Sequence, residues 1–352
     1  MKIAVIGAGL FGTTTAVHLA RNGFDVTLFE KEGGILRAAS GINQYRLHRG
    51  YHYPRSKETA DSARASEQSF QDMYGDALID DVTHFYCIAK EDSKVSGKEM
   101  LMFCDSCNLE YVHEMPAGIR SDAIDLSIRV RESLINHERL KSLIEDQLQV
   151  RGVKQIFNTE VTVGMLTDYD IVVNCTYANL NRVLDALPDS QQLYQFEICE
   201  KPVLQLPTTF KKQSIVIMDG PFMCIDPYAD TPFHVMGNVV HAIHASNVGL
   251  HPIVPEALIP FLNKGVIKNP SVTNIDYFIE SASHFMPSIT EAKHIGSMYT
   301  IRTVLADVDA TDERPTLVRR VGDNVINVFS GKLGTSVDAA HQVLALVKEM
   351  TS

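Results

Sequence analysis

The first thirty residues constrain the fold more than any other part of the chain. Residues 3–6, IAVI, are typical of a short buried strand, which leads into the turn GAGLFG over residues 7–12. A helical pattern covers residues 13–22, and a second strand over residues 25–29 ends at Glu30. A strand, a glycine turn, a helix, a strand and an acid in this order predict a βαβ unit that binds a dinucleotide.

Each glycine of this turn has a chemical reason. Gly7 allows the tight turn, Gly9 lets a pyrophosphate approach the backbone, and Gly12 lets the helix pack close to the strand. The helix N-terminus offers free N–H groups and a partial positive charge to the phosphates. Glu30 follows Gly12 by 18 residues, where a carboxylate binds the adenosine ribose and repels a 2′-phosphate, which argues against NADP.

Length and composition narrow the class of protein. The 352 residues are enough for two domains or for one large core with insertions. A net charge of −11 argues against a nucleic-acid partner, and the apolar runs are too short to span a bilayer. Because Met1 and Lys2 lead directly into the first strand, we expect no export signal and a cytoplasmic location.

The six cysteines are scattered, which is typical of free thiols in a reducing compartment. Cys104 and Cys107 have the spacing of a metal or redox pair, and His113 lies nearby in the sequence. No second pair follows at the spacing of a zinc site, so we predict no metal site.

The rest of the chain alternates between helical and strand patterns. Residues 33–56 lack periodicity but are rich in Arg, His and Tyr, which favours contact with a ligand. Asn136 is a candidate N-cap, with Arg139 where a capping box would have Glu. Helices are predicted at 57–75, 98–107, 136–150, 256–263, 274–285 and 336–350, and strands at 82–89, 123–130, twice within 153–163, 171–176, several times within 193–251, 297–305 and 325–329.

Four pieces of this sequence resemble the FAD-dependent oxidoreductases of the D-amino-acid oxidase superfamily. They are the turn 7–12 with Glu30, VVNCT at 172–176, YTIR at 299–302, and SGKLGT at 330–335. A fifth piece, NQYRLHRGYHYP at 43–54, is similar to segments of L-2-hydroxyglutarate oxidoreductases and of glycerol-3-phosphate dehydrogenases. One departure is Tyr177, which stands where the family's Ala-Thr-Gly strand end has Gly.

The resemblance implies an α/β fold with two interleaved parts. A Rossmann-type FAD-binding domain of the glutathione-reductase kind would comprise residues 1–56, 121–185 and 312–352. A substrate domain built on a mixed or antiparallel sheet would comprise residues 57–120 and 186–311, where the resemblance is thin.

The resemblance also implies FAD as the cofactor. The glycine turn would hold the pyrophosphate, Glu30 the ribose, Val161 the adenine, and residues 331–335 the isoalloxazine edge. The residues expected to contact FAD are Gly7, Gly9, Leu10, Phe11, Gly12, Glu30, Lys31, Arg37, Asn43, Arg46, Leu47, His48, Val161, Cys175, Thr176, Gly331, Lys332, Leu333, Gly334 and Thr335.

Four residues are candidates for the chemistry. His48 suits the removal of a hydroxyl proton because imidazole titrates near neutral pH, although it could instead only hydrogen-bond the flavin. The resemblance implies that Arg302 holds a substrate carboxylate through two hydrogen bonds, and the alternative is a surface salt bridge. Lys332 would assist as a charge near the flavin, and His52 would line the pocket.

The predicted activity is therefore that of an FAD-dependent oxidoreductase. It would move a hydride from the C–H of a small amino acid, amine or 2-hydroxy acid to the flavin, then to oxygen or another acceptor. The substrate would carry a carboxylate or another anion. The alternatives are a flavoprotein that modifies sugars or natural products, a redox-neutral flavin-binding protein, and an NAD-dependent enzyme.

Overall fold

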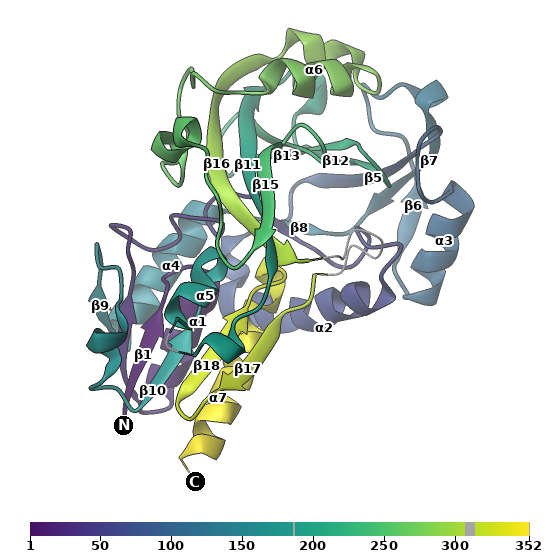
Figure 1. Ribbon diagram of the computed structural model, residues 1–352. Coiled ribbons are helices and arrows are strands. Elements are labelled where there is room, and N and C mark those ends of the chain that lie inside the picture. Colours follow the sequence, from purple (N-terminus) through teal and green to yellow (C-terminus); the bar gives the residue numbers. More distant parts are fainter. Residues whose placement is uncertain (186, 307–313, 352) are drawn as a thin grey trace.

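A computed structural model describes residues 1–185, 187–306 and 314–351, and its two large sheets meet near the middle of the molecule (Figure 1). The lower sheet has six strands in the order β17-β18-β10-β1-β2-β9. All neighbours are parallel except β17, which is antiparallel to β18. The strands are β1 (Lys2–Ile6), β2 (Asp25–Phe29), β9 (Lys154–Ile156), β10 (Ile171–Asn174), β17 (Leu317–Val321) and β18 (Val325–Phe329). This parallel core confirms the predicted Rossmann-type domain.

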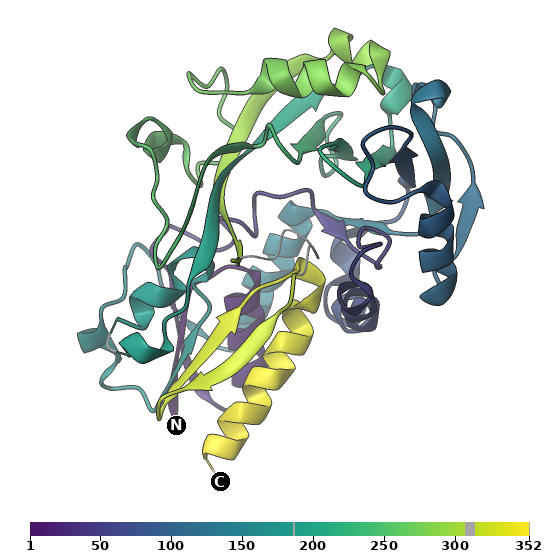
Figure 2. The ribbon, with the colours of Figure 1, turned by 45° about the vertical axis from the view of Figure 1, so that its right-hand side comes forward.

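Helices cover one face of the six-stranded sheet (Figure 2). Helix α1 (Leu10–Arg21) packs against both α4 (His137–Val150) and α7 (Ser336–Met350), and α2 (Lys57–Tyr74) packs against α7. The opposite face is covered by the 3-10 turn η3 (Val163–Leu166) and the short helix α5 (Leu180–Val183). The sheet is therefore buried on both faces, as a parallel sheet requires.

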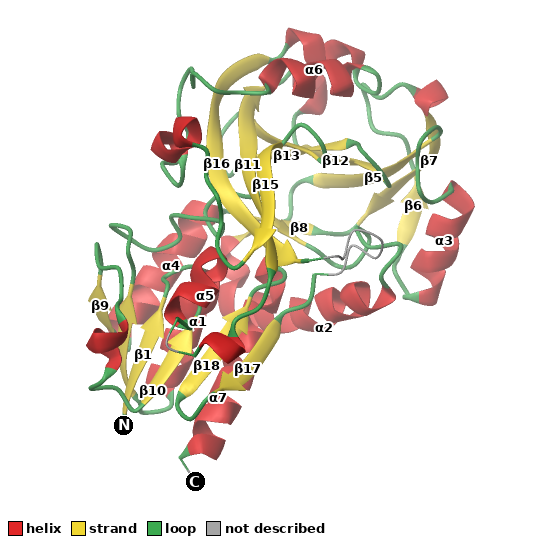
Figure 3. Cartoon of the chain, viewed as in Figure 1, coloured by secondary structure: helices red, strands yellow, loops and turns green. Residues whose placement is uncertain are grey.

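The upper sheet has nine strands and is mixed, as predicted (Figure 3). Its order is β15-β11-β14-β13-β12-β5-β7-β6, with β16 also paired to β11, and β5 and β12 are its parallel pair. Helix α6 (Ile275–Ser283) covers one end and α3 (Gly97–Ser106) lies at the other. The strands are β5 (Thr83–Ala89), β6 (Tyr111–His113), β7 (Ile124–Val130), β11 (Tyr194–Gln205), β12 (Gln213–Met218), β13 (Met223–Pro227), β14 (His234–Asn238), β15 (Ile243–Gly249) and β16 (Lys293–Leu305).

Smaller elements complete the fold. A three-stranded sheet joins β3 (Arg46–Leu47), β8 (Ser133–Ile135) and β4 (Leu78–Ile79). The remaining 3-10 turns are η1 (Gly75–Ala77), η2 (Ser121–Ala123), η4 (Tyr177–Asn179), η5 (Pro188–Ser190), η6 (Thr208–Phe210), η7 (Glu256–Phe261), η8 (Pro287–Glu291) and η9 (Leu333–Thr335).

Local capping explains two helix starts. Asn136 accepts hydrogen bonds from the backbone N–H groups of Glu138 and Arg139, each at 3.2 Å, which confirms it as the N-cap of α4. Helix α3 begins with a full capping box between Ser96 and Glu99, which the sequence prediction missed.

Several predicted boundaries were wrong. Helix α1 begins at Leu10 rather than Thr13, because the glycine turn itself supplies its first turn. Only one strand, β9, forms within residues 153–163, because Asn158 adopts a left-handed conformation with φ of 53° and Thr159 donates its N–H to the Glu30 carbonyl. The segment 256–263 is the 3-10 turn η7 rather than an α-helix, and it contains Pro260, which has no N–H to donate.

The two sheets are linked by the long strands β11 and β16, which pair from Tyr194 opposite Leu305 to Gln205 opposite Lys293. At the lower end, Tyr194 stacks on Phe329 of β18 with ring centroids 5.2 Å apart. The division into two domains stays a proposal, and its boundaries at 185/186 and 311/312 involve residues outside the described ones. Strand β7, which lies within the predicted FAD-binding part, pairs with β5 of the upper sheet.

In the described ranges, the structure contains no helix that is long and apolar enough to cross a membrane. All six cysteines are free thiols, and five of them are buried. Cys104 and Cys107 pack into an apolar cluster between α3 and the upper sheet.

Candidate functional site

The glycine turn brings β1 and α1 into close contact. Gly7 has a φ of 96°, which favours glycine, and a Cβ atom on Gly12 would lie 1.8 Å from the Gly7 carbonyl oxygen. Gly9 is the N-cap residue of α1, and Leu10 donates its N–H to Ser40 Oγ at 2.9 Å. The first turn of α1 therefore faces an open cavity with its backbone N–H groups, as an anion site needs.

Glu30 closes the opposite side of this turn. Its carboxylate accepts hydrogen bonds from the backbone N–H groups of Ala8, at 2.7 Å, and of Glu32, at 2.9 Å. These two contacts fix the carboxylate at the end of β2. A carboxylate has about four acceptor positions, so Glu30 can still accept hydrogen bonds from a ribose.

One cavity of about 450 Å³ begins at Glu30 and Val161 and extends past α1 to Arg302 and Lys332. Most residues predicted to contact FAD line it: Gly7, Gly9, Leu10, Phe11, Glu30, Lys31, Arg37, Asn43, Arg46, His48, Val161, Cys175, Thr176, Gly331, Lys332 and Leu333. Arg302 and His52, predicted for the chemistry, line it as well. An elongated cavity with a glycine-lined helix N-terminus at one end and an acid at the ribose position fits FAD.

Four predicted contacts lie behind the cavity wall. Gly12 packs on Gly7, and a Cβ atom on Gly334 would lie 3.0 Å from Leu47. Thr335 hydrogen-bonds to Thr316 and to the Lys332 carbonyl. Gly12, Leu47, Gly334 and Thr335 do not line the cavity, and their contact with FAD stays a prediction.

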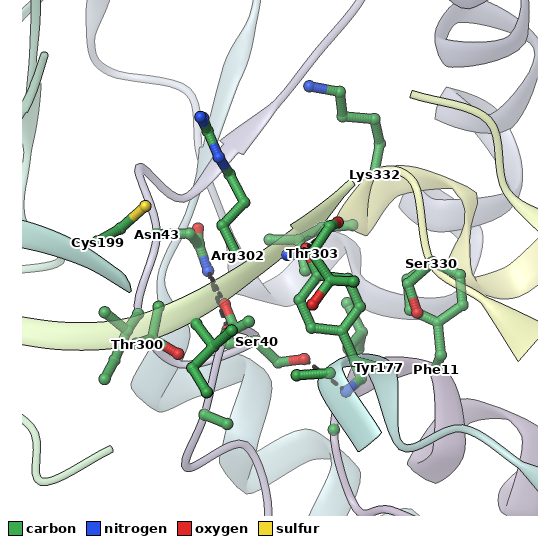
Figure 4. Close-up of a pocket in the computed structure, with 18 of the residues that line it drawn as sticks. Phe11, Ser40, Asn43, Tyr177, Cys199, Thr300, Arg302, Thr303, Ser330 and Lys332 are labelled. Carbon is green, nitrogen blue, oxygen red and sulfur yellow. Dashed lines mark hydrogen bonds between the residues drawn. The ribbon is translucent and has the colours of Figure 1, made fainter. Parts of the chain in front are cut away.

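The aperiodic segment 33–56 forms one wall of the cavity. Asn43 donates to the carbonyl groups of Ala39 and Ser40 and accepts the N–H of Tyr45, which holds the segment in a tight loop (Figure 4). Sequence reasoning missed Ser40, although the helix N-terminus beside it needs a polar partner.

The Arg46 side chain has a structural role that the prediction did not anticipate. Its guanidinium is buried and donates to Asp226 at 2.7 Å, to Glu132 at 3.3 Å and to Ser214. Tyr86 also donates to Glu132, at 2.9 Å. Because these bonds occupy the guanidinium, we expect Arg46 to contact FAD through its backbone atoms. The network holds the segment that carries His48 against the upper sheet.

His48 is half-buried at the cavity wall, between His52, Tyr53 and Lys332. The ring centroids of His48 and His52 are 5.1 Å apart, and Lys332 Nζ lies 4.5 Å from the Tyr53 ring centroid. Burial lowers the pKa of His48 well below its usual value, and the charges of Lys332 and His52 lower it further. Nδ1 of His48 is buried without a hydrogen-bond partner in the part of the chain that the structure describes.

Arg302 extends from β16 toward the same side of the cavity as Lys332 (Figure 4). It lies opposite Glu197 in the β11–β16 pairing, and both Nε and Nη2 contact one carboxylate oxygen of Glu197. Burial raises the pKa of Glu197, but the charge and hydrogen bonds of Arg302 outweigh it and hold that pKa below its usual value. The Nε edge of the guanidinium is therefore held by Glu197, while the side chain, 41% exposed overall, lines the cavity.

Tyr177 shapes the cavity next to Phe11 (Figure 4). Its φ of 53° is a conformation that favours glycine, which is the residue the family has there. Its hydroxyl donates to the Thr303 carbonyl at 2.9 Å and accepts the Thr303 N–H at 3.0 Å. Tyr177 therefore ties η4 to β16.

Strand β11 contributes residues that the sequence prediction missed. Alternate side chains of a strand point to the same face, so Cys199 and Lys201 share the face of Glu197, and both line the cavity. The alternation of side chains along residues 197–201 could have indicated these residues, but the alternation alone did not show which face of the strand lines the cavity. In the described part of the chain, no group of three or more His, Cys, Asp or Glu residues is placed to hold a metal ion.

Comparisons with known proteins agree with this geometry. The profile of the family described as "FAD dependent oxidoreductase" matches residues 2–332. The FAD-dependent monooxygenase kojA of Aspergillus flavus is 27% identical over 379 residues, covering 99% of this chain and 86% of the relative. FAD-dependent monooxygenase FPY4 of Fusarium mangiferae is 24% identical over 355 residues, covering 99% and 91%.

Two solved structures share the fold. Glycine oxidase from Geobacillus kaustophilus has a TM-score of 0.73 at 15% identity, covering 99% of this chain and 94% of that one. L-α-glycerophosphate oxidase from Mycoplasma pneumoniae, solved with FAD bound, has a TM-score of 0.75 at 12% identity, covering 99% and 94%.

Proposed function

Because the chain belongs to the family of FAD-dependent oxidoreductases, we propose that it takes a hydride from a carbon bearing an amine or hydroxyl group in a small anionic substrate. FAD is its cofactor and, when bound, accepts the hydride and passes the electrons to oxygen or another acceptor. The protein's own residues bind and orient the substrate and exclude water.

One observation carries this proposal: residues of the kind that bind a dinucleotide and positively charged side chains line the same cavity. The glycine turn and Glu30 lie at one end, and Arg302, Lys332 and Lys201 line the other. Glu197 pairs with Arg302, so the cations outnumber the acids at that end. Such an excess of positive charge attracts a substrate that carries a carboxylate or a phosphate.

The state of His48 supports the amine version of the reaction. A neutral imidazole can accept a hydroxyl proton, but its lowered pKa makes that transfer unfavourable at neutral pH. An amine that enters in its neutral form needs no such base. In both versions His48 can hydrogen-bond the substrate through Nδ1, which is buried and faces no partner in the described residues.

The proposal is tested by following flavin absorbance without oxygen. The purified holoprotein would be mixed with amino acids, 2-hydroxy acids, sugar acids and glycerol phosphate in turn. Rapid bleaching by an anionic amine or alcohol is expected, and reoxidation by air would then separate an oxidase from a dehydrogenase. A holoprotein bleached by none of these compounds contradicts the proposal, and a colourless protein as purified would contradict the role of FAD.

Variants of His48 separate the amine and hydroxyl versions. We expect His48→Gln to keep the wild-type bleaching rate with an amine substrate, and loss of bleaching with an alcohol substrate would assign the base role to His48. An alcohol oxidised equally fast by the variant would exclude His48 as the base. His294→Gln, in which a histidine outside the cavity is replaced, is the matched control.

The names of the curated relatives favour a second candidate function. Two relatives that match 99% of this chain are called FAD-dependent monooxygenases. In that reaction one atom of molecular oxygen would enter the product. Turnover under isotopically labelled oxygen, followed by mass spectrometry of the product, distinguishes this candidate from hydride removal alone.

A further inference from the structure

We propose that Lys201, together with the side-chain amide of Gln44, forms the site that binds the anionic group of the substrate. The inference rests on the proposed function, because it names residues that recognise the charge of the same substrate. It differs from the sequence prediction, which gave this role to Arg302.

The first step compares the partners of three of the cations that line the cavity. Arg302 is paired with Glu197 through Nε and Nη2. Arg46 is buried among Asp226, Glu132 and Ser214. Lys201 has no hydrogen bond or ion pair to any residue in the described ranges, and it lines the cavity.

The second step is the placement of Lys201 relative to Gln44. Gln44 lines the same cavity, and its amide nitrogen is buried without a partner in the described part of the chain. A Cβ atom on Gly237 would lie 2.5 Å from this nitrogen and 2.7 Å from Cys224 Sγ. The Gln44 amide and the Cys224 thiol therefore both pack against the position on β14 where Gly237 has no side chain. Cys224 is also an electrostatic neighbour of Lys201, so both donors lie at this end of the cavity.

The third step is the electrostatic environment of the ammonium group. Burial lowers the pKa of Lys201, and Arg302 on β16 lowers it further. Cys199 on its own strand, Cys224 and Asp226 on β13 act in the opposite direction, and Asp226 is itself bound to Arg46. A lysine that is destabilised in its charged form regains that energy when an anion binds next to it.

At alkaline pH, where part of the Lys201 ammonium has lost its proton, binding of an anion is therefore linked to the uptake of a proton by Lys201. Anion affinity should fall as the pH rises from neutrality toward about 10, the ordinary range in which lysine titrates. Arg302 stays protonated throughout this range, so it cannot produce the same dependence.

The test uses the holoprotein and three simple probes, acetate, glycolate and inorganic phosphate. Flavin absorbance reports binding without turnover, and calorimetry at alkaline pH in two buffers of different ionisation enthalpy reports proton uptake. We expect Lys201→Met to weaken binding about 10- to 100-fold, the effect of one charge-assisted hydrogen bond, and to abolish proton uptake. Lys201→Arg should retain binding but lose the uptake, and Gln44→Glu should repel every probe.

Three variants separate this site from its neighbours. Arg302→Met and His48→Gln should both keep the proton uptake, because neither side chain is its source. Lys211→Met, which removes an exposed lysine outside the cavity, is the matched control and should behave as wild type. Proton uptake that survives in Lys201→Met, or that disappears in His48→Gln, would overturn the assignment.

The outcome is separable from that of the proposed function. If the wild-type holoprotein binds none of the three anions, the Lys201 site is refuted, even if an uncharged amine bleaches the flavin. If anions bind with proton uptake but no compound bleaches the flavin, the site stands and the proposed oxidation fails.

Discussion

Replacing Gly12 by alanine should show how far both the fold and FAD binding depend on the close approach of α1 to β1. The new Cβ atom would lie 1.8 Å from the Gly7 carbonyl oxygen, whereas ordinary contacts begin at 3.4 Å. The two backbone segments must therefore move about 1.6 Å apart, and no flexible side chain can absorb this shift. Overpacking of this kind costs about 1 to 3 kcal/mol, and backbone contacts lie at the upper end of that range.

The movement should weaken FAD binding as well as the fold. The N-terminus of α1 would shift away from the phosphates, and the loss of one charge-assisted hydrogen bond of about 1.5 to 3 kcal/mol lowers affinity roughly 10- to 100-fold. Flavin fluorescence titration of the apoprotein measures the affinity, and urea denaturation measures the stability.

A matched control is Gly164→Ala, because a Cβ atom on Gly164 would meet no atom within 4 Å. This variant should bind FAD and unfold as wild type does. If Gly12→Ala also retains wild-type affinity and stability, the close approach of α1 to β1 does not position the phosphate site, and the reasoning is refuted.

Three further predictions follow from single side chains. Burial lowers the pKa of His84 to about 3, so below pH 6.5 the unfolded chain binds a proton that the folded chain does not, and the free energy of unfolding should fall as the pH drops toward 3. In His84→Phe, urea titrations should show a dependence of that free energy on pH that is shallower by up to about 1.4 kcal/mol per pH unit. An unchanged slope would exclude His84 as its source. Tyr177→Phe loses both hydrogen bonds to Thr303 and should cost about 1 to 3 kcal/mol of unfolding free energy, while Tyr277→Phe, at a side chain 58% exposed, should cost almost nothing. Glu30→Gln should bind FAD roughly tenfold more weakly, and equal affinity would show that the carboxylate does not contact the ribose.

Local features of the sequence were sufficient to predict the first part of the fold. The order of β1, the glycine turn, α1 and β2 could be predicted because each step depends on residues close together in the chain. The same holds for α7, whose predicted bounds agree with the observed Ser336–Met350. Periodicity and glycine placement carry this information without any knowledge of tertiary contacts.

The arrangement of charges in the cavity could not be predicted in the same way. The pair of Arg302 with Glu197 joins residues 105 positions apart, and it depends on the register of β11 against β16. The bond from Arg46 to Asp226 spans 180 positions. Sequence patterns placed Arg46 among the FAD contacts and Arg302 at the substrate carboxylate, but they could not show that Asp226 and Glu197 pair with these two side chains.

The alternation along β11 has a consequence for how this protein can change. Glu197, Cys199 and Lys201 stand on one face of a single strand, and none of them belongs to the glycine turn or the segment beside it. If the proposed substrate site is right, substitutions at these three positions would change charge and shape beside the substrate and leave the glycine turn unaltered. Recognition of the substrate could then diverge, in evolution or in the laboratory, through exchanges along one strand.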